Sequence, residues 1–244
     1  MERKVALVTG AAKGIGAATV RALANNGYSV VIHYNKSEEK ALGLMRELLA
    51  REVNCTVIKA DLSVRSEAES LYDESKKCFG FVDTVINNAG VCHFGLLTYD
   101  GEEEYRRVMD SNFGSAFNVT SLFARDMVSF GRGKIINIAS VWGSRGAALE
   151  SLYSASKSAL IGYTKAAAKE LITSGVTVNC LLPGYVKTDM NAQFDEEEEK
   201  AILRRMRQKE ALTPEDVANA ILTTLSQNLT GKILPVNSKD FIIK

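Results

Sequence analysis

The sequence is poor in cysteine and proline, has almost no net charge and lacks any long apolar run. It holds four cysteines and three prolines in 244 residues, and 30 Lys and Arg stand against 29 Asp and Glu. The balanced charge disfavours a nucleic-acid partner, which would need a basic excess. Without an apolar signal region or the roughly 20 apolar residues of a membrane span, a cytosolic protein is expected.

The cysteines and histidines give no sign of a metal or disulfide site. The four cysteines include no CxxC pair, so neither a zinc cage nor a disulfide framework is predicted, and most of them are expected to be buried small apolar residues. No cluster of His, Cys and carboxylates has ligand spacing, so no metal is expected. His33 and His93 have no partner pattern for a catalytic triad, and both are interpreted as incidental.

Short apolar, β-branched runs alternate with longer amphipathic stretches along the whole chain. This alternation is typical of βα units around a parallel sheet. The expected strands are 5–8, 29–33, 55–60, 83–86, 134–139, 177–182 and 232–236. The expected helices are 15–26, 37–51, 65–79, 102–129, 152–174 and 215–226, the last with Pro214 in its first turn. The prediction is one α/β domain over residues 1–244: a doubly wound Rossmann-type fold with a seven-stranded parallel sheet flanked by helices.

One segment, residues 186–212, interrupts the alternation. It carries a run of acids from Asp195 to Glu199, followed by Lys200 and then Arg204 and Arg205. Acids near the start and bases near the end suit a solvated helix, because the helix dipole favours both. Since the segment follows the C-terminal end of a strand, where open α/β sheets bind ligands, it is also a candidate substrate lid.

A glycine-rich segment follows the first expected strand directly and leads into a helix. It reads Thr9-Gly10-Ala11-Ala12-Lys13-Gly14-Ile15-Gly16. Glycines let the backbone turn tightly and approach a pyrophosphate, while the helix N-terminus offers free N–H groups. A tight strand-to-helix turn alone would also explain the glycines, and the spacing differs from the GxGxxG fingerprint.

The order TGxxxGxG resembles instead the loop of the short-chain dehydrogenase/reductase family. Three further segments are similar to that family: 87–90 (NNAG), 153–157 (YSASK) and 183–184 (PG). The resemblance runs from Val5 to about Val236 and implies a nicotinamide-dependent oxidoreductase. The cofactor contacts that we expect from it are Gly10, Ala12, Lys13, Gly14, Ile15, Gly16, Asn35, Lys36, Asp61, Leu62, Asn88, Ala89, Gly90, Tyr153, Lys157, Pro183, Gly184, Val186 and Thr188.

The end of the second expected strand bears on the choice of nucleotide. An NAD enzyme places an acid there for the ribose 2′-hydroxyl, but this sequence reads His33-Tyr34-Asn35-Lys36. Lys36 and Lys13 could pair with a 2′-phosphate, or be merely solvated; charge complementarity favours NADP(H). Asp61-Leu62 looks like the family's adenine-contacting pair, with a helix N-cap role for Asp61 or Ser63 as the alternative.

Tyr153 and Lys157 are four residues apart in an expected helix, so their side chains share one face. A free tyrosine has a pKa of roughly 10, and a nearby ammonium lowers it by favouring the phenolate. Tyr153 is therefore expected to give its proton to a carbonyl oxygen as hydride reaches the carbon. Ser140, after the fifth strand, would hold the same oxygen. Asn112 matches the family's helix asparagine, which supports a water next to the lysine.

Each of these side chains has a plainer interpretation when taken alone. Tyr153 could be a half-buried helix residue and Ser140 a strand-end cap. The combination of both with Lys157 and the upstream glycine loop favours catalysis. A protein that keeps the fold and the nucleotide but has lost catalysis is a less favoured alternative. Five residues in loops at the C-terminal ends of strands are expected in the substrate-pocket wall: Cys92, Phe94, Trp142, Leu149 and Tyr185.

The substrate is suggested only by resemblance within the family. Residues 133–140 and 183–190 look most like the 3-oxoacyl-[acyl-carrier-protein] reductases of bacterial fatty acid synthesis. Residues 91–97 and 140–143 are also similar to reductases of the 5-aminopentanone group on elongation factor P, and a reductase of another small ketone is a further alternative. The family resemblance implies a homotetramer, although residues 236–239 replace the glycine pair usual after the last strand.

Overall fold

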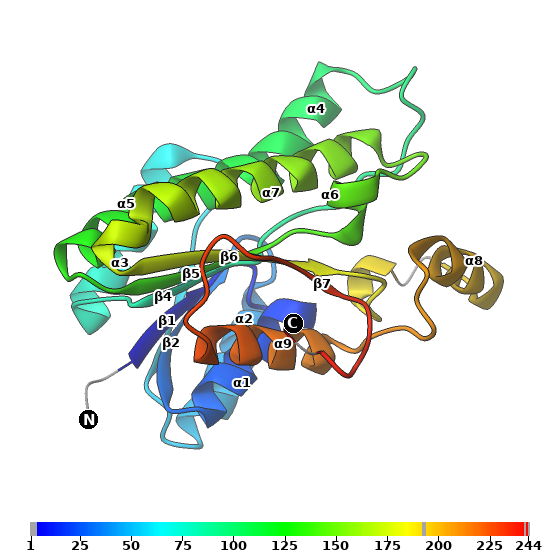
Figure 1. Cartoon of the computed structure of the whole chain (residues 1–244). Coiled ribbons are helices and arrows are strands. Elements are labelled where there is room, and N and C mark those ends of the chain that lie inside the picture. The colour runs from blue at the N-terminus through cyan, green and yellow to red at the C-terminus, as the bar shows by residue number, and fades with distance from the viewer. Residues whose placement is uncertain (1–3, 192–193, 242, 244) are drawn as a thin grey trace.

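The computed structural model of the chain describes residues 4–191, 194–241 and 243 (Figure 1). Its centre is a parallel sheet with the order β3-β2-β1-β4-β5-β6-β7. The strands are β1 Lys4–Val8, β2 Tyr28–Tyr34, β3 Cys55–Lys59, β4 Thr84–Asn87, β5 Gly133–Ile138, β6 Val176–Pro183 and β7 Ile233–Val236. The doubly wound, seven-stranded prediction is confirmed, and every strand end falls within about one residue of its expected place.

Helices cover both faces of this sheet (Figure 1). They are α1 Gly14–Asn25, α2 Glu38–Leu49, α3 Arg65–Phe79, α4 Glu102–Met109, α5 Ser115–Ser129, α6 Val141–Arg145, α7 Ser151–Leu171, α8 Glu196–Met206 and α9 Pro214–Ser226. Helices α1, α2 and α9 pack on one face, and α3, α5 and α7 on the other. Thr213 accepts a hydrogen bond from the Asp216 N–H ahead of Pro214, so the expected start of the last helix is confirmed.

Two helical stretches differ from the sequence prediction. The expected helix 102–129 is divided by a π-helical turn, Asp110–Gly114, which inserts an extra residue between α4 and α5. The expected helix 152–174 ends at Leu171 and continues as a 3₁₀ turn, Ile172–Ser174. Within 186–212 the charged run forms α8, where the Asp195 carboxylate accepts from the Glu197 and Glu198 N–H groups.

The core lies in two apolar layers because each strand sends alternate side chains to opposite faces. In β1, Ala6 and Val8 pack toward α1 and α9, whereas Val5 and Leu7 pack toward α3 and α5. These four side chains are at most 1% exposed. Burial on both faces explains why the strands appear in the sequence as continuous apolar runs.

The expected burial of most cysteines is wrong. Cys180 in β6 is buried, but Cys55 is half-buried, and Cys78 and Cys92 are exposed. Cys78 lies near the C-terminal end of α3 on its solvent-exposed side, and Cys92 lies in a loop. Across the described residues no helix is long and apolar enough to cross a membrane. The same residues contain no group of three or more His, Cys, Asp and Glu side chains that could hold a metal.

Candidate active site

The glycine loop after β1 is held against the segment that follows β4, at the point where the strand order reverses. The Thr9 hydroxyl accepts hydrogen bonds from the Asn88 and Ala89 N–H groups, both at 2.9 Å, and the Asn88 amide donates to the Thr9 carbonyl. Gly10 has φ +62°, and a Cβ there would lie 2.9 Å from the Ala89 Cα. A side chain at Gly10 would therefore separate the two segments.

His33 fixes the other side of the loop. Its Nδ1 accepts from the Gly10 N–H at 3.0 Å, so its Nε2 carries the proton and donates to the Ala60 carbonyl at 2.9 Å. The ring is 2% exposed, and burial lowers the pKa of His33 to about 4. The interpretation of His33 as incidental is wrong: its neutral ring joins β2, β3 and the glycine loop.

The start of α1 offers unpaired N–H groups. Its N-cap, Lys13, makes no side-chain capping bond within the described chain, and the first turn holds no acid. A Cβ on Gly16 would collide with the Gly10 carbonyl, so the loop wraps tightly over the helix start. Such a terminus binds anions, because its free N–H groups and the helix dipole both favour negative charge. The residues present therefore fit a nucleotide pyrophosphate.

The residues expected near the adenosine end lie at the ends of β2 and β3. Lys13 and Lys36 are exposed. Asp61 accepts from the Ser63 N–H and hydroxyl at 3.1 and 2.6 Å, and these bonds, with Asn35 and Lys36 nearby, lower the pKa of Asp61. Helix α3 begins only at Arg65, with Val64 as its N-cap. The N-cap alternative for Asp61 or Ser63 is therefore wrong.

Ser140, Tyr153 and Lys157 come together at the C-terminal ends of β5 and β6. Ser140 is the N-cap of α6, where its Oγ accepts from the Trp142 N–H at 3.2 Å, and its hydroxyl also hydrogen-bonds Tyr153. Lys157 is 5% exposed; its Nζ donates to the Ile138 carbonyl at 3.0 Å and lies 5.8 Å from the Tyr153 ring centroid. Burial lowers the pKa of Lys157 to about 8.

The expected fall in the pKa of Tyr153 is not found in this structure. Burial raises the pKa of Tyr153, the hydrogen bond with Ser140 lowers it in part, and the nearby Glu150 and Cys92 side chains raise it further. Lys157 does not offset the desolvation, since its ammonium is turned toward the Ile138 carbonyl.

Asn112 occupies the π-helical turn and is fully buried. Its Oδ1 accepts from the Val91 N–H at 2.7 Å, and its Nδ2 donates to the Val91 carbonyl and the Ser156 hydroxyl at 3.0 and 2.9 Å. A Cβ on Gly90 would lie 2.8 Å from that Oδ1 and 3.3 Å from the Lys157 Nζ. Asn112 thus ties the loop after β4 to α7, directly beside Lys157.

A cavity of about 150 Å³ opens above these side chains. Its wall includes Ser140, Tyr153 and Lys157 together with seven of the expected cofactor contacts: Ile15, Asn88, Gly90, Pro183, Gly184, Val186 and Thr188. The other expected contacts, Gly10, Ala12, Lys13, Gly14, Gly16, Asn35, Lys36, Asp61, Leu62 and Ala89, do not line it.

The pocket-wall prediction is partly right. Cys92, Phe94, Trp142 and Tyr185 line the cavity, but Leu149 does not. The prediction missed Glu150, Met190, Asn191, Phe194, Ile202 and Met206, of which all but Glu150 belong to the 186–212 segment. His93, interpreted as incidental, also lines the cavity, and its Nε2 lies 2.6 Å from Asp100 Oδ1. The sequence signal for His93 was weak because Asp100 is seven residues away in an irregular loop.

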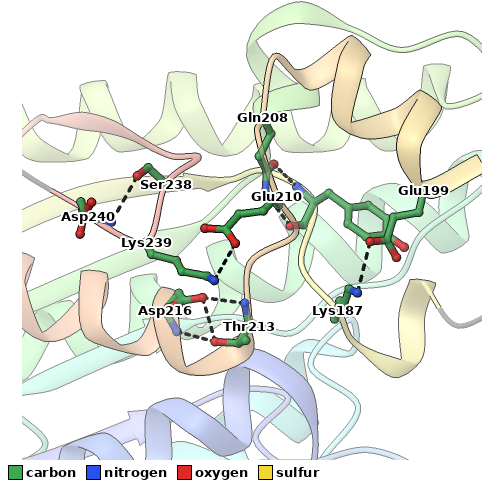
Figure 2. A network of polar contacts seen from close by, with 10 residues as sticks. Lys187, Glu199, Gln208, Glu210, Thr213, Asp216, Ser238, Lys239 and Asp240 are labelled. Carbon is green, nitrogen blue, oxygen red and sulfur yellow. Dashed lines mark hydrogen bonds and ion pairs between the residues drawn. The ribbon is translucent and has the colours of Figure 1, made fainter. Parts of the chain in front are cut away.

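The 186–212 segment is fastened beside the cavity by Gln208, which is 6% exposed. Its Oε1 accepts from the Tyr185 N–H at 2.8 Å, while its Nε2 donates to the Tyr185 and Glu210 carbonyls at 2.9 and 2.7 Å (Figure 2). Ion pairs flank this clamp, Lys187 with Glu199 at 3.3 Å and Lys239 with Glu210 at 2.7 Å (Figure 2). A Cβ on Gly184 would collide with the Gln208 Oε1.

Comparison with known proteins agrees with this geometry. The family model described as short chain dehydrogenase matches residues 4–199, so the chain belongs to the short-chain dehydrogenase family and is an oxidoreductase of that family. It is 34% identical over 237 residues to the 3-oxoacyl-[acyl-carrier-protein] reductase FabG of Staphylococcus aureus (strain Mu50 / ATCC 700699), covering 96% of each chain.

Two further matches extend the likeness. A 3-oxoacyl-[acyl-carrier-protein] reductase of Synechocystis sp. is 37% identical over 218 residues, which cover 89% of this chain and 87% of that protein. The crystal structure of a blue fluorescent protein from a metagenomic library, in complex with NADPH, matches with a TM-score of 0.89 and 33% identity over 96% of both chains. The resemblance inferred from the motifs is confirmed.

Proposed function

We propose that this protein is an NADPH-dependent ketone reductase, with Ser140, Tyr153 and Lys157 as its catalytic side chains. The observation that carries the proposal is their convergence in one cavity, which also contacts the segments that hold the glycine loop. NADPH, when bound, supplies hydride to the carbonyl carbon. A glycine cradle and an open helix N-terminus on the same sheet edge support this nucleotide.

In the proposed reaction Tyr153 is the general acid. Because burial and Glu150 raise its pKa, Tyr153 stays protonated at neutral pH and is ready to donate in the reducing direction. The Ser140 hydroxyl, already hydrogen-bonded to Tyr153, stabilises the negative charge that develops on the substrate oxygen. The Lys157 ammonium, 5.8 Å from the Tyr153 ring centroid, stabilises the phenolate that remains once it turns from the Ile138 carbonyl toward the ring, and Asn112 positions Lys157 by holding the loop beside it.

Replacement of Tyr153 by Phe tests the catalytic assignment. It removes the proton donor while keeping the ring, so ketone reduction should fall at least a thousandfold with little change in NADPH affinity. Reduction is followed by NADPH oxidation and affinity by quenching of protein fluorescence. Turnover within tenfold of the wild type would refute the role of Tyr153. Loss of NADPH binding would instead mean that the substitution had damaged the nucleotide site.

We propose NADPH over NADH because Lys13, in the glycine loop, and Lys36, just after β2, are exposed cations that can pair with a 2′-phosphate. The positive charge of Lys36 is partly offset by the nearby Asp61. Lys13 lies near Asp189, whose carboxylate pairs with Lys40 at 2.7 Å. Replacing Lys13 and Lys36 together with Gln should lower kcat/KM for NADPH at least tenfold and leave that for NADH nearly unchanged. Equal kcat/KM values for the two nucleotides in the wild type would refute the preference.

The names of the two similar reductases support a 3-oxoacyl thioester, delivered on a carrier protein, as the first candidate substrate. The alternative is a ketone with an amino group, such as the 5-aminopentanone group on elongation factor P, and Glu150 in the cavity wall favours it. Acetoacetyl thioesters measured beside a 5-aminopentanone-modified protein should differ by several tens-fold in kcat/KM, about 2 kcal/mol. A homotetramer is a further proposal, from family resemblance alone, which light scattering tests.

A further inference from the structure

Glu150 places a carboxylate in the wall of the substrate cavity. It precedes α7 by one residue and Tyr153 by three, and it is the N-cap position of α7, yet its side chain makes no capping bond. Instead the carboxylate hydrogen-bonds Trp142, and its charge reaches Tyr153 strongly enough to raise that pKa. Its side chain is therefore directed into the cavity.

Within the part of the chain that the structure describes, no cation balances this carboxylate. Among the described residues, no Lys or Arg forms an ion pair with Glu150; Lys157, in the same wall, donates to the Ile138 carbonyl. Burial raises the pKa of Glu150, which reflects the cost of removing its charge from water without a cation beside it. A neutral acyl chain in the cavity would increase that cost.

Aromatic rings surround the same space. Phe94, Trp142, Tyr185 and Phe194 all line the cavity, and the Phe94 and Phe194 rings meet edge-on with centroids 6.3 Å apart. The faces of aromatic rings attract cations, and a carboxylate among them adds a charged hydrogen-bond acceptor. This combination suits a protonated amine better than an uncharged or anionic chain.

We propose that Glu150 is a specificity-determining residue, which binds a protonated amino group carried by the ketone substrate. The inference rests on the proposed reductase function. Carbonyl reduction needs only Ser140, Tyr153 and Lys157, whereas Glu150 selects which ketone reaches them. Asp100, another carboxylate near the cavity, already pairs with His93, with 2.6 Å between Asp100 Oδ1 and His93 Nε2. It therefore does not compete for the amine.

A matched pair of aryl ketones tests the charge alone. 4-(Aminomethyl)acetophenone and 4-ethylacetophenone have nearly the same shape, but only the first carries an ammonium group near neutral pH, and neither can cyclise. We would measure kcat/KM for both with NADPH in the wild type, in Glu150→Gln and in Glu103→Gln. The last substitution removes the same charge from an exposed position on α4. Binding without turnover is followed through Trp142, the only tryptophan of the chain.

The wild type should prefer the ammonium ketone at least tenfold in kcat/KM and in affinity. Glu150→Gln should abolish that preference, whereas Glu103→Gln should keep it. Because loss of the Glu150 charge also changes Tyr153, the kcat of one ketone alone does not report recognition of the amine, and the ratio of kcat/KM between the two ketones does. A wild type without the preference, or a preference that survives Glu150→Gln, would overturn the inference.

The same measurements distinguish failure of this inference from failure of the proposed reductase function. If acetoacetyl thioester or 4-ethylacetophenone is reduced without any preference for the amine, the inference is wrong and the reductase proposal stands. If no ketone is reduced although NADPH binds, the proposed function is wrong, and the inference fails with it.

Discussion

Lys157 should make the enzyme less stable at neutral pH, so that Lys157→Met yields a more stable but inactive protein. The lysine is 5% exposed, and burial lowers its pKa from 10.5 to about 8. At about 1.4 kcal/mol per tenfold change, this fall corresponds to about 3 kcal/mol of destabilisation in the folded state. Methionine has a similar length, no charge and good packing properties. It also loses the hydrogen bond to the Ile138 carbonyl, which costs about 1–2 kcal/mol.

The net effect should depend on pH in a defined direction. Because the folded pKa of Lys157 lies below the unfolded value, the unfolded chain binds more protons between pH 8 and 10.5. The penalty is fully present below about pH 8 and disappears as the pH rises to about 10.5. Lys157→Met should therefore be more stable than the wild type by about 1–2 kcal/mol at pH 7, and less stable by a similar amount near pH 10.5.

Urea unfolding of the nucleotide-free proteins between pH 7 and 10.5 measures this difference. Lys165→Met, at an exposed position of the same helix, is the matched control and should follow the wild type. A variant less stable than the wild type at pH 7, or a difference that does not change with pH, would contradict the assignment of Lys157 as an unbalanced buried cation.

Two further predictions concern buried side chains that hold the site together. Since the folded pKa of His33 is lowered to about 4, its contribution is intact above about pH 6.5, and up to about 3 kcal/mol is lost as the pH falls to 4. His33→Gln should show a flatter loss of stability over that range in urea unfolding. Gln208→Glu would set a carboxylate against the Tyr185 and Glu210 carbonyls, so the 186–212 segment should be cut faster by protease and KM for ketone should rise at least fivefold. If the Gln208→Glu variant is cut by protease at the wild-type rate and keeps the wild-type KM, Gln208 does not hold the 186–212 segment in place.

The strands were predictable because their burial on both faces leaves continuous apolar runs, and the glycines between them mark where the loops turn. The ends of the helices were less predictable from the sequence. The division of the expected helix 102–129 depends on the Asn112 side chain reaching Val91 and Ser156, contacts that no local propensity encodes. Similarly, Gly10 signals a turn in the sequence, but its need to contact Ala89 becomes visible only in the fold.

The cavity illustrates the same limit for function. Tyr153 and Lys157 were predictable because their spacing is local and helical, whereas His93 and Phe194 reach the wall from irregular segments and Met206 from the end of α8. Glu150 was missed although it stands three residues from Tyr153. A single acid before a helix usually serves its dipole or its cap. Only the absence of a capping bond, together with the Trp142 contact, separates Glu150 from that ordinary role.

Recognition and proton transfer are coupled through the charge of Glu150. In the free site that charge raises the pKa of Tyr153 and so makes it a weaker acid. A cation that pairs with Glu150 would cancel this effect, because the nearby negative charge that opposes the phenolate would be neutralised. A matching substrate would then strengthen its own proton donor, and discrimination between charged and neutral ketones should appear in kcat as well as in KM. With a neutral ketone bound, the pKa of Tyr153 would stay raised. Binding energy from other contacts would not lower the resulting barrier to proton transfer.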